Sequence, residues 1–104
     1  MGKEKTKEEA EIERIRIPKE NEVFGRVEQM LGGDRMLVVC EDGKERICRI
    51  PGKLRKRVWI KPGDLILVQP WKIQGDRRGD VIFRYTPTQV NWLKKKGYAK
   101  GLEI

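Results

Sequence analysis

Short apolar stretches alternate with turn residues along the central part of the chain, residues 23–85. Each stretch is too short for a typical helix and is rich in branched or aromatic residues, which predicts β-strands. The five predicted strands are Val23–Leu31, Arg35–Cys40, Glu45–Ile50, Leu65–Pro70 and Asp80–Tyr85. Glycine-containing turn signals separate most of them. Five short strands joined mainly by tight turns indicate a small β-barrel.

The Asp42-Gly43 pair predicts a two-residue hairpin between the second and third strands. In that register Val39 pairs with Arg46, and side chains alternate between the two faces of the sheet. One face would hold Leu37, Val39, Cys48 and Ile50, and the other Val38, Cys40, Ile47 and Arg49. We expect the first face to be the core. The two cysteines would then lie on opposite faces, as small buried apolar residues and not as a disulfide.

Residues 86–97 are predicted to form a helix because both of its ends are marked. Thr86 is a favourable N-cap, and Gln89 completes a capping box with it. The lysines at 94–96 suit the negative end of the helix dipole, and Gly97 suits the position after the helix. The side chains expected to pack on the barrel are Val90, Trp92 and Leu93.

The two ends of the chain are predicted to lie outside the barrel. Residues 1–19 mix lysine and glutamate with few apolar residues, which is typical of a flexible charged tail. Balanced charges there are compatible with a short helix over 7–14. The predicted organisation is a tail at 1–19, a barrel at 20–85, a helix at 86–97 and a frayed end at 98–104.

Composition excludes several classes of protein. A chain of 104 residues indicates one domain, and no apolar run reaches the roughly 18 residues of a membrane span. The N-terminus has no apolar signal segment, which predicts a cytoplasmic protein. Histidine is absent, and two cysteines alone cannot complete a zinc site. We therefore expect a monomer that is not an enzyme and needs no cofactor.

The net charge of +8 is concentrated in one segment. Residues 44–61 contain eight cations and a single acid, Glu45. Overlapping this segment, the stretch IPGKLRKRVWIKPGD, residues 50–64, places five cations around Trp59 between two Pro-Gly pairs. A dense cationic run that includes an aromatic residue attracts polyanions, most often nucleic acid.

The position of this run separates two small barrel folds. It forms an insert of about 13 residues between the third and fourth strands. This long connection, together with a bend expected at Gly25, favours an oligonucleotide-binding (OB) barrel over an SH3-like barrel. The predicted fold class is mainly β: a five-stranded OB-fold barrel with a C-terminal α-helix and a flexible N-terminal tail.

The order PGKLRK, VWI, GDLILV and DVIFRY resembles the translation initiation factor 1A family, and the resemblance covers about residues 20–98. The charge-balanced tail favours the archaeal form, and bacterial initiation factor one is similar in a looser way. The resemblance implies an S1-like OB domain that binds rRNA in the decoding (A) site of the small ribosomal subunit. It also implies help in loading initiator tRNA and mRNA, and cooperation with a translational GTPase.

Cations in the insert and on neighbouring elements are candidates to neutralise phosphates, while Trp59 offers a surface for base stacking. The candidate RNA-binding residues are Arg35, Arg46, Arg49, Lys53, Arg55, Lys56, Arg57, Trp59, Lys61, Arg77 and Arg78. Leu54 and Val58 are expected to anchor the insert by burial. Two alternatives stay open: Trp59 could instead seal the barrel, and the protein could be a generic RNA chaperone of the cold-shock class. The predicted second and third strands lack the aromatic residues common in that class.

Overall fold

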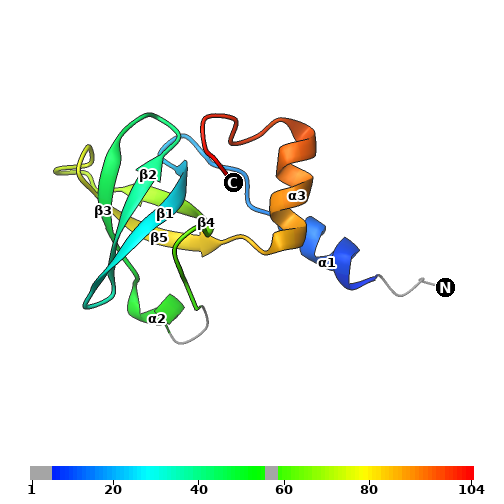
Figure 1. The fold of residues 1–104 in the computed structure, drawn as a ribbon, viewed down its shortest axis with the longest axis horizontal. Coiled ribbons are helices and arrows are strands. Elements are labelled where there is room, and N and C mark those ends of the chain that lie inside the picture. The colour runs from blue at the N-terminus through cyan, green and yellow to red at the C-terminus, as the bar shows by residue number, and fades with distance from the viewer. Residues whose placement is uncertain (1–5, 56–58) are drawn as a thin grey trace.

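The computed structural model describes residues 6–55 and 59–104, in which five strands close into a barrel (Figure 1). The strands are β1 (Val23–Gly32), β2 (Arg35–Cys40), β3 (Glu45–Arg49), β4 (Leu65–Pro70) and β5 (Arg78–Arg84). Their order around the barrel is β1-β2-β3-β5-β4, and only the β3–β5 pair is parallel. This arrangement is consistent with the OB fold, so the predicted fold class is confirmed.

Three helices accompany the barrel in the described residues: α1 (Lys7–Glu13), α2 (Gly52–Arg55) and α3 (Pro87–Lys96). α2 lies in the predicted insert between β3 and β4. α3 has the predicted capping box at Thr86, and Gly97 ends it in the left-handed conformation, with φ of 84°. Within the described ranges, no helix is long and apolar enough to cross a membrane.

The predicted register of the β2–β3 hairpin is wrong by one residue. Val38 pairs with Arg46, because the turn contains three residues and not two. Cys40 N–H donates to the Lys44 carbonyl at 2.9 Å, and Gly43 follows the bend with φ of 85°. A glycine in this conformation suits a three-residue loop as well as a two-residue one.

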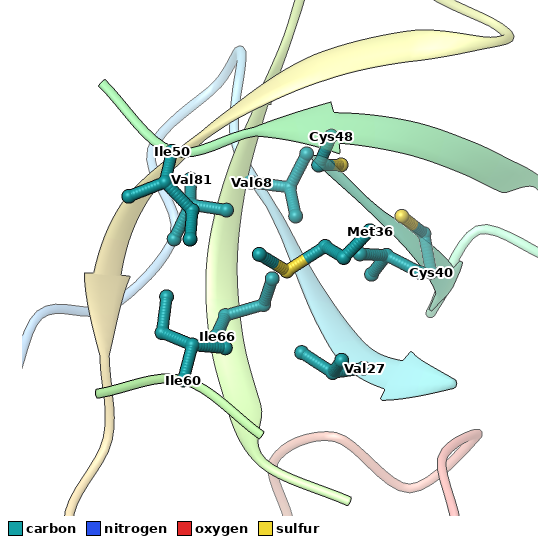
Figure 2. Packing of buried hydrophobic residues seen from close by; sticks show 10 residues of the cluster. Val27, Met36, Cys40, Cys48, Ile50, Ile60, Ile66, Val68 and Val81 are labelled. Atoms are coloured by element: carbon teal, nitrogen blue, oxygen red, sulfur yellow. The ribbon is translucent and has the colours of Figure 1, made fainter. Parts of the chain in front are cut away.

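The one-residue shift exchanges the two faces of β2 relative to β3. Cys48 and Ile50 face the core as predicted, whereas Val38 and Cys40 take the place there that was predicted for Leu37 and Val39. Both cysteines therefore point into the barrel, among the apolar side chains shown in Figure 2, and both are free thiols. Their predicted burial is confirmed, whereas the prediction of opposite faces is wrong. Burial raises the pKa of Cys40 and raises that of Cys48 to about 12, so neither is a reactive thiolate at neutral pH. The buried cluster is Val27, Met36, Val38, Cys40, Cys48, Ile50, Ile60, Ile66, Val68 and Val81.

A second apolar cluster lies between the outside of the barrel and α3. Phe24 and Tyr85 from the barrel pack there with Leu93 of α3. The prediction that residues 98–104 are frayed is wrong, because Ala99 and Leu102 are buried in this cluster. Covering the apolar outer face of the barrel removes these side chains from water, which stabilises the folded end of the chain.

The segment before the barrel runs along α3 in the described residues. Gln89 of α3 donates to the Glu11 carbonyl at 2.8 Å, and the Tyr85 hydroxyl donates to the Arg16 carbonyl. Ile15 packs against the second cluster. The short helix expected near 7–14 is present as α1, while the flexibility of the tail stays a prediction.

Candidate nucleic-acid interface

The β3–β4 insert is tied at both ends to the β1–β2 hairpin by backbone hydrogen bonds. At its entry, Ile50 N–H donates to the Asp34 carbonyl at 2.9 Å. At its exit, Gly63 N–H donates to the Val27 carbonyl at 2.8 Å, and Val27 N–H donates to the Asp64 carbonyl at 2.9 Å. The insert and the hairpin tip therefore occupy the same end of the barrel, as Figure 1 shows.

A tight turn fixes the exit of the insert. Asp64 N–H donates to the Lys61 carbonyl at 3.1 Å, and Gly63 adopts the left-handed conformation with φ of 91°. A proline followed by a left-handed glycine is the sequence of a type II turn. The Asp64 carboxylate accepts from Lys61 N–H at 3.0 Å and from Arg84 Nε at 3.1 Å. These contacts fix the path of the chain that follows Trp59.

The described side chains of the insert divide into one anchor and several exposed groups. Leu54 packs against the barrel core, as predicted. Trp59 is 86% exposed, so it does not seal the barrel. Lys53 and Lys61 are exposed, and their side chains have no hydrogen-bond or ion-pair partner in the parts of the chain that the structure describes. Four predictions concern groups outside the part of the chain that the structure describes: Lys56, Arg57, Val58 and the side chain of Arg55.

Three arginines lie on the outer face of adjacent strands, two of them at the end of β3 where the insert begins. Arg35 of β2 lies directly opposite Arg49 of β3, and Arg78 of β5 lies opposite Ile47. Ile47 pairs with Leu37 of β2 on its other side, and both of these apolar residues are half-buried. Directly opposed like charges destabilise a sheet unless something neutralises them. We call Arg35, Arg49 and Arg78 the outer-face arginines.

Arg49 is held in place by an aromatic ring and a carboxylate. Its guanidinium lies 5.6 Å from the ring centroid of Trp71, and its Nε lies 3.4 Å from Asp80 Oδ1. Trp71 Nε1 donates to the same Asp80 oxygen at 3.0 Å. All three line an open hollow of about 970 Å³. A positioned guanidinium can contact phosphate or stack on an unpaired base.

With this geometry in view, the comparisons with known proteins decide the family. A family model described as "Translation initiation factor 1A / IF-1" matches residues 10–102. The chain belongs to the translation initiation factor 1A / IF-1 family. It therefore has a role in translation initiation, and the resemblance inferred from the sequence motifs is confirmed.

Relatives named translation initiation factor 1A support the same assignment. The one from Pyrococcus abyssi is 59% identical over 95 residues, which cover 91% of this chain and 84% of the relative. The one from Methanopyrus kandleri is 60% identical over 86 residues, covering 83% and 77% respectively. Their names describe an initiation factor and not an enzyme.

Solved structures agree with the barrel. A translation initiation factor from the wolbachia endosymbiont strain TRS of Brugia malayi matches with a TM-score of 0.52 at 30% identity. That match covers 66% of this chain and 82% of the other. YjeQ from Thermotoga maritima also has a TM-score of 0.52, at 21% identity, over 62% of this chain and 23% of its own, which supports the fold alone.

In this translation initiation factor 1A family member, Arg46 differs from the other candidate cations. It is only 3% exposed, and its guanidinium donates to both Asp42 oxygens, at 3.0 and 2.8 Å. Its Nε donates to the Gly75 carbonyl at 2.5 Å. Burial alone would lower the pKa of Arg46, but its hydrogen bonds outweigh this effect and raise that pKa. Arg46 therefore has a structural role, on the inner side of β3, where the predicted pairing with Val39 had also placed it.

The remaining candidates lie farther from the insert. Arg77 is exposed on the β4–β5 loop, which the Arg46–Gly75 contact ties to the β2–β3 turn at the other end of β3. The structure thus groups the insert with the outer-face arginines and leaves Arg77 apart. Sequence reasoning missed the role of Trp71, since a single aromatic in a polar loop has no characteristic spacing.

Proposed function

We propose that this factor binds rRNA in the decoding (A) site of the small ribosomal subunit and promotes the loading of initiator tRNA and mRNA. The observation that carries the proposal is a group of exposed cations at one end of the barrel, Lys53, Lys61 and Arg35. Their side chains have no hydrogen-bond or ion-pair partner among the described residues. Membership of the initiation factor family supports an RNA of the ribosome as the partner. Cooperation with a translational GTPase, and action as a monomer, belong to the same proposal.

Each part of the interface has a distinct task in this proposal. The insert and the outer-face arginines neutralise phosphates, and the barrel fixes their orientation. Trp59 offers its exposed ring to a base, a contact worth about 1–3 kcal/mol in typical RNA-binding proteins. Arg49, positioned against the Trp71 ring, contacts the RNA backbone or the edge of a base.

A titration of purified small subunits at several salt concentrations tests this function. If about five phosphates are neutralised, the logarithm of affinity falls with the logarithm of the salt concentration with a slope of roughly −3.5 to −4.5. Charge reversal at Arg55 and Arg57 should abolish binding while leaving the thermal unfolding transition unchanged. Binding that ignores salt, or survives the reversal, contradicts the proposal.

The same titration with an unstructured RNA addresses the alternative of a generic RNA chaperone. The described outer face between β2 and β3 presents Arg35, Leu37, Ile47 and Arg49, and none of these is aromatic. Promiscuous binding of single strands uses aromatic stacking platforms. We therefore expect much weaker binding to the unstructured RNA than to small subunits, and equal affinities would favour the chaperone function.

A further inference from the structure

An acidic residue, Asp80, lies in the same row of strand pairs as two of the outer-face arginines. The pairing of adjacent strands places Arg35 opposite Arg49, Arg49 opposite Asp80, and Asp80 opposite Gln69. A carboxylate in this row repels phosphate, so by its charge alone it should weaken the binding of RNA. Its presence beside Arg49 therefore needs a reason other than direct contact with the nucleic acid.

Asp80 joins the Arg49 guanidinium to the Trp71 ring. A single oxygen, Oδ1, accepts from Trp71 Nε1 at 3.0 Å and lies 3.4 Å from Arg49 Nε. The guanidinium also lies 5.6 Å from the ring centroid, so each of the three groups contacts the other two. Trp71 is itself attached to β5, because its N–H donates to the Arg78 carbonyl at 3.1 Å.

The two charged members of this group differ in how far they reach solvent. The Arg49 side chain is 58% exposed, whereas that of Asp80 is 25% exposed. A partner molecule therefore reaches the guanidinium more readily than the carboxylate. A pair as exposed as this contributes little to folding stability, so stability alone does not account for the arrangement.

We propose that Asp80 is a positioning residue, which holds Arg49 against Trp71 in the orientation that contacts RNA. This inference rests on the proposed function. A long side chain loses rotamer freedom when it binds, and one that is already ordered avoids part of that cost. Asp80 also reduces the repulsion between Arg35 and Arg49, which lie directly opposite each other. These two gains exceed the repulsion between the carboxylate and phosphate.

The sign of the effect of Asp80→Ala tests this inference in the full chain. We expect affinity for small subunits to fall about threefold, although the substitution removes a negative charge from an RNA-binding face. Glu20→Ala is the matched control, because Glu20 is exposed, lines the same hollow and has the same charge. It should retain or slightly raise affinity. If thermal unfolding shows that Asp80→Ala does not fold, Asp80→Asn, which keeps the shape without the charge, takes its place.

A double-mutant cycle separates positioning from a general structural role. In the Arg49→Ala background, Asp80→Ala should cause no further loss of affinity, because the group that it positions is absent. Equal losses in the two backgrounds would overturn the inference. So would an affinity for small subunits that is unchanged or raised in Asp80→Ala alone.

Nuclear magnetic resonance measures the positioning without RNA. In ¹⁵N relaxation of the free protein, the Arg49 Nε–H group should be ordered, should lose that order in Asp80→Ala and should keep it in Glu20→Ala. Order retained in Asp80→Ala would overturn the inference. If the unmodified protein does not bind small subunits, the proposed function fails, whereas loss of Arg49 order in Asp80→Ala would still support positioning by Asp80.

Discussion

The charged side chains near the two ends of β3 differ in whether they are paired within the protein. At the β2–β3 turn, Arg46 is buried on Asp42, and Lys44 Nζ lies 2.7 Å from Asp76. At the insert, the side chains of Lys53 and Lys61 have no hydrogen-bond or ion-pair partner among the described residues. Charges that are paired internally stabilise or orient the fold, whereas exposed charges left unpaired are available to a partner. The number of cations alone does not separate these roles.

Among the side chains that the structure describes, the largest effect is expected from reversing the unpaired charges. Lys53→Glu with Lys61→Glu removes two candidate phosphate contacts and adds two repulsions, so affinity for small subunits should fall about 1,000-fold. Both side chains are exposed, so the unfolding transition should stay in place. Filter binding and thermal unfolding measure the two quantities; retained affinity would show that the insert does not contact RNA.

Arg46→Ala should act on stability instead. It removes a buried guanidinium and leaves the Gly75 carbonyl without this donor, so the free energy of unfolding should fall by about 3 kcal/mol. Denaturant unfolding measures the loss. If Arg46→Ala folds normally but fails to bind subunits, then Arg46 reaches RNA and the structural role assigned to it is wrong.

Arg49→Ala is the matched variant three residues away. The Arg49 side chain is 58% exposed, so its ion pair with Asp80 should contribute less than about 0.5 kcal/mol to stability. Affinity should fall about tenfold, and the salt slope should become shallower by about one unit. Loss of stability without loss of affinity would reverse the roles of Arg46 and Arg49.

Asp42→Asn tests the paired end through pH. Hydrogen bonds from Arg46 hold the pKa of Asp42 below its usual 3.8 in the folded state. A lowered pKa stabilises the fold above the unfolded value, and this contribution is lost as pH falls through the folded value. At pH 7 the variant should lose about 1 kcal/mol, allowing for solvent screening of a carboxylate that is 37% exposed. As pH falls below 3.8 and through the lower folded pKa, the stability of the variant in urea unfolding should approach that of the unmodified protein. A difference in stability that does not depend on pH would count against the Asp42–Arg46 pair.

Lys44→Ala should have the smallest effect. Its partner Asp76 is exposed, and ion pairs of this kind contribute little. We expect no resolvable change in unfolding or in subunit binding. A clear loss of affinity would mean that the interface extends to the β2–β3 turn.

Local signals were enough to predict the strands, the insert and both ends of α3. Thr86, Gln89 and Gly97 act within a few residues of their own position, so their roles could be inferred directly. The insert was recognisable because its cations are contiguous in sequence.

Features that depend on distant pairing could not be predicted in this way. The Asp42-Gly43 signal fits loops of two or three residues, and a change of one residue decides whether Leu37 and Val39 or Val38 and Cys40 point into the barrel. The contact of Arg49 with Trp71 joins β3 to the β4–β5 loop. The burial of Leu102 depends on the apolar outer face of the barrel, which no local pattern indicates.

Footprinting of small-subunit rRNA with and without the protein tests the central claim most directly, namely that the unpaired cations beside the insert hold RNA. We predict protection confined to the decoding region, lost in the Lys53→Glu, Lys61→Glu variant and retained in Lys44→Ala. Protection elsewhere on the subunit, or protection that survives the double charge reversal, would contradict the account.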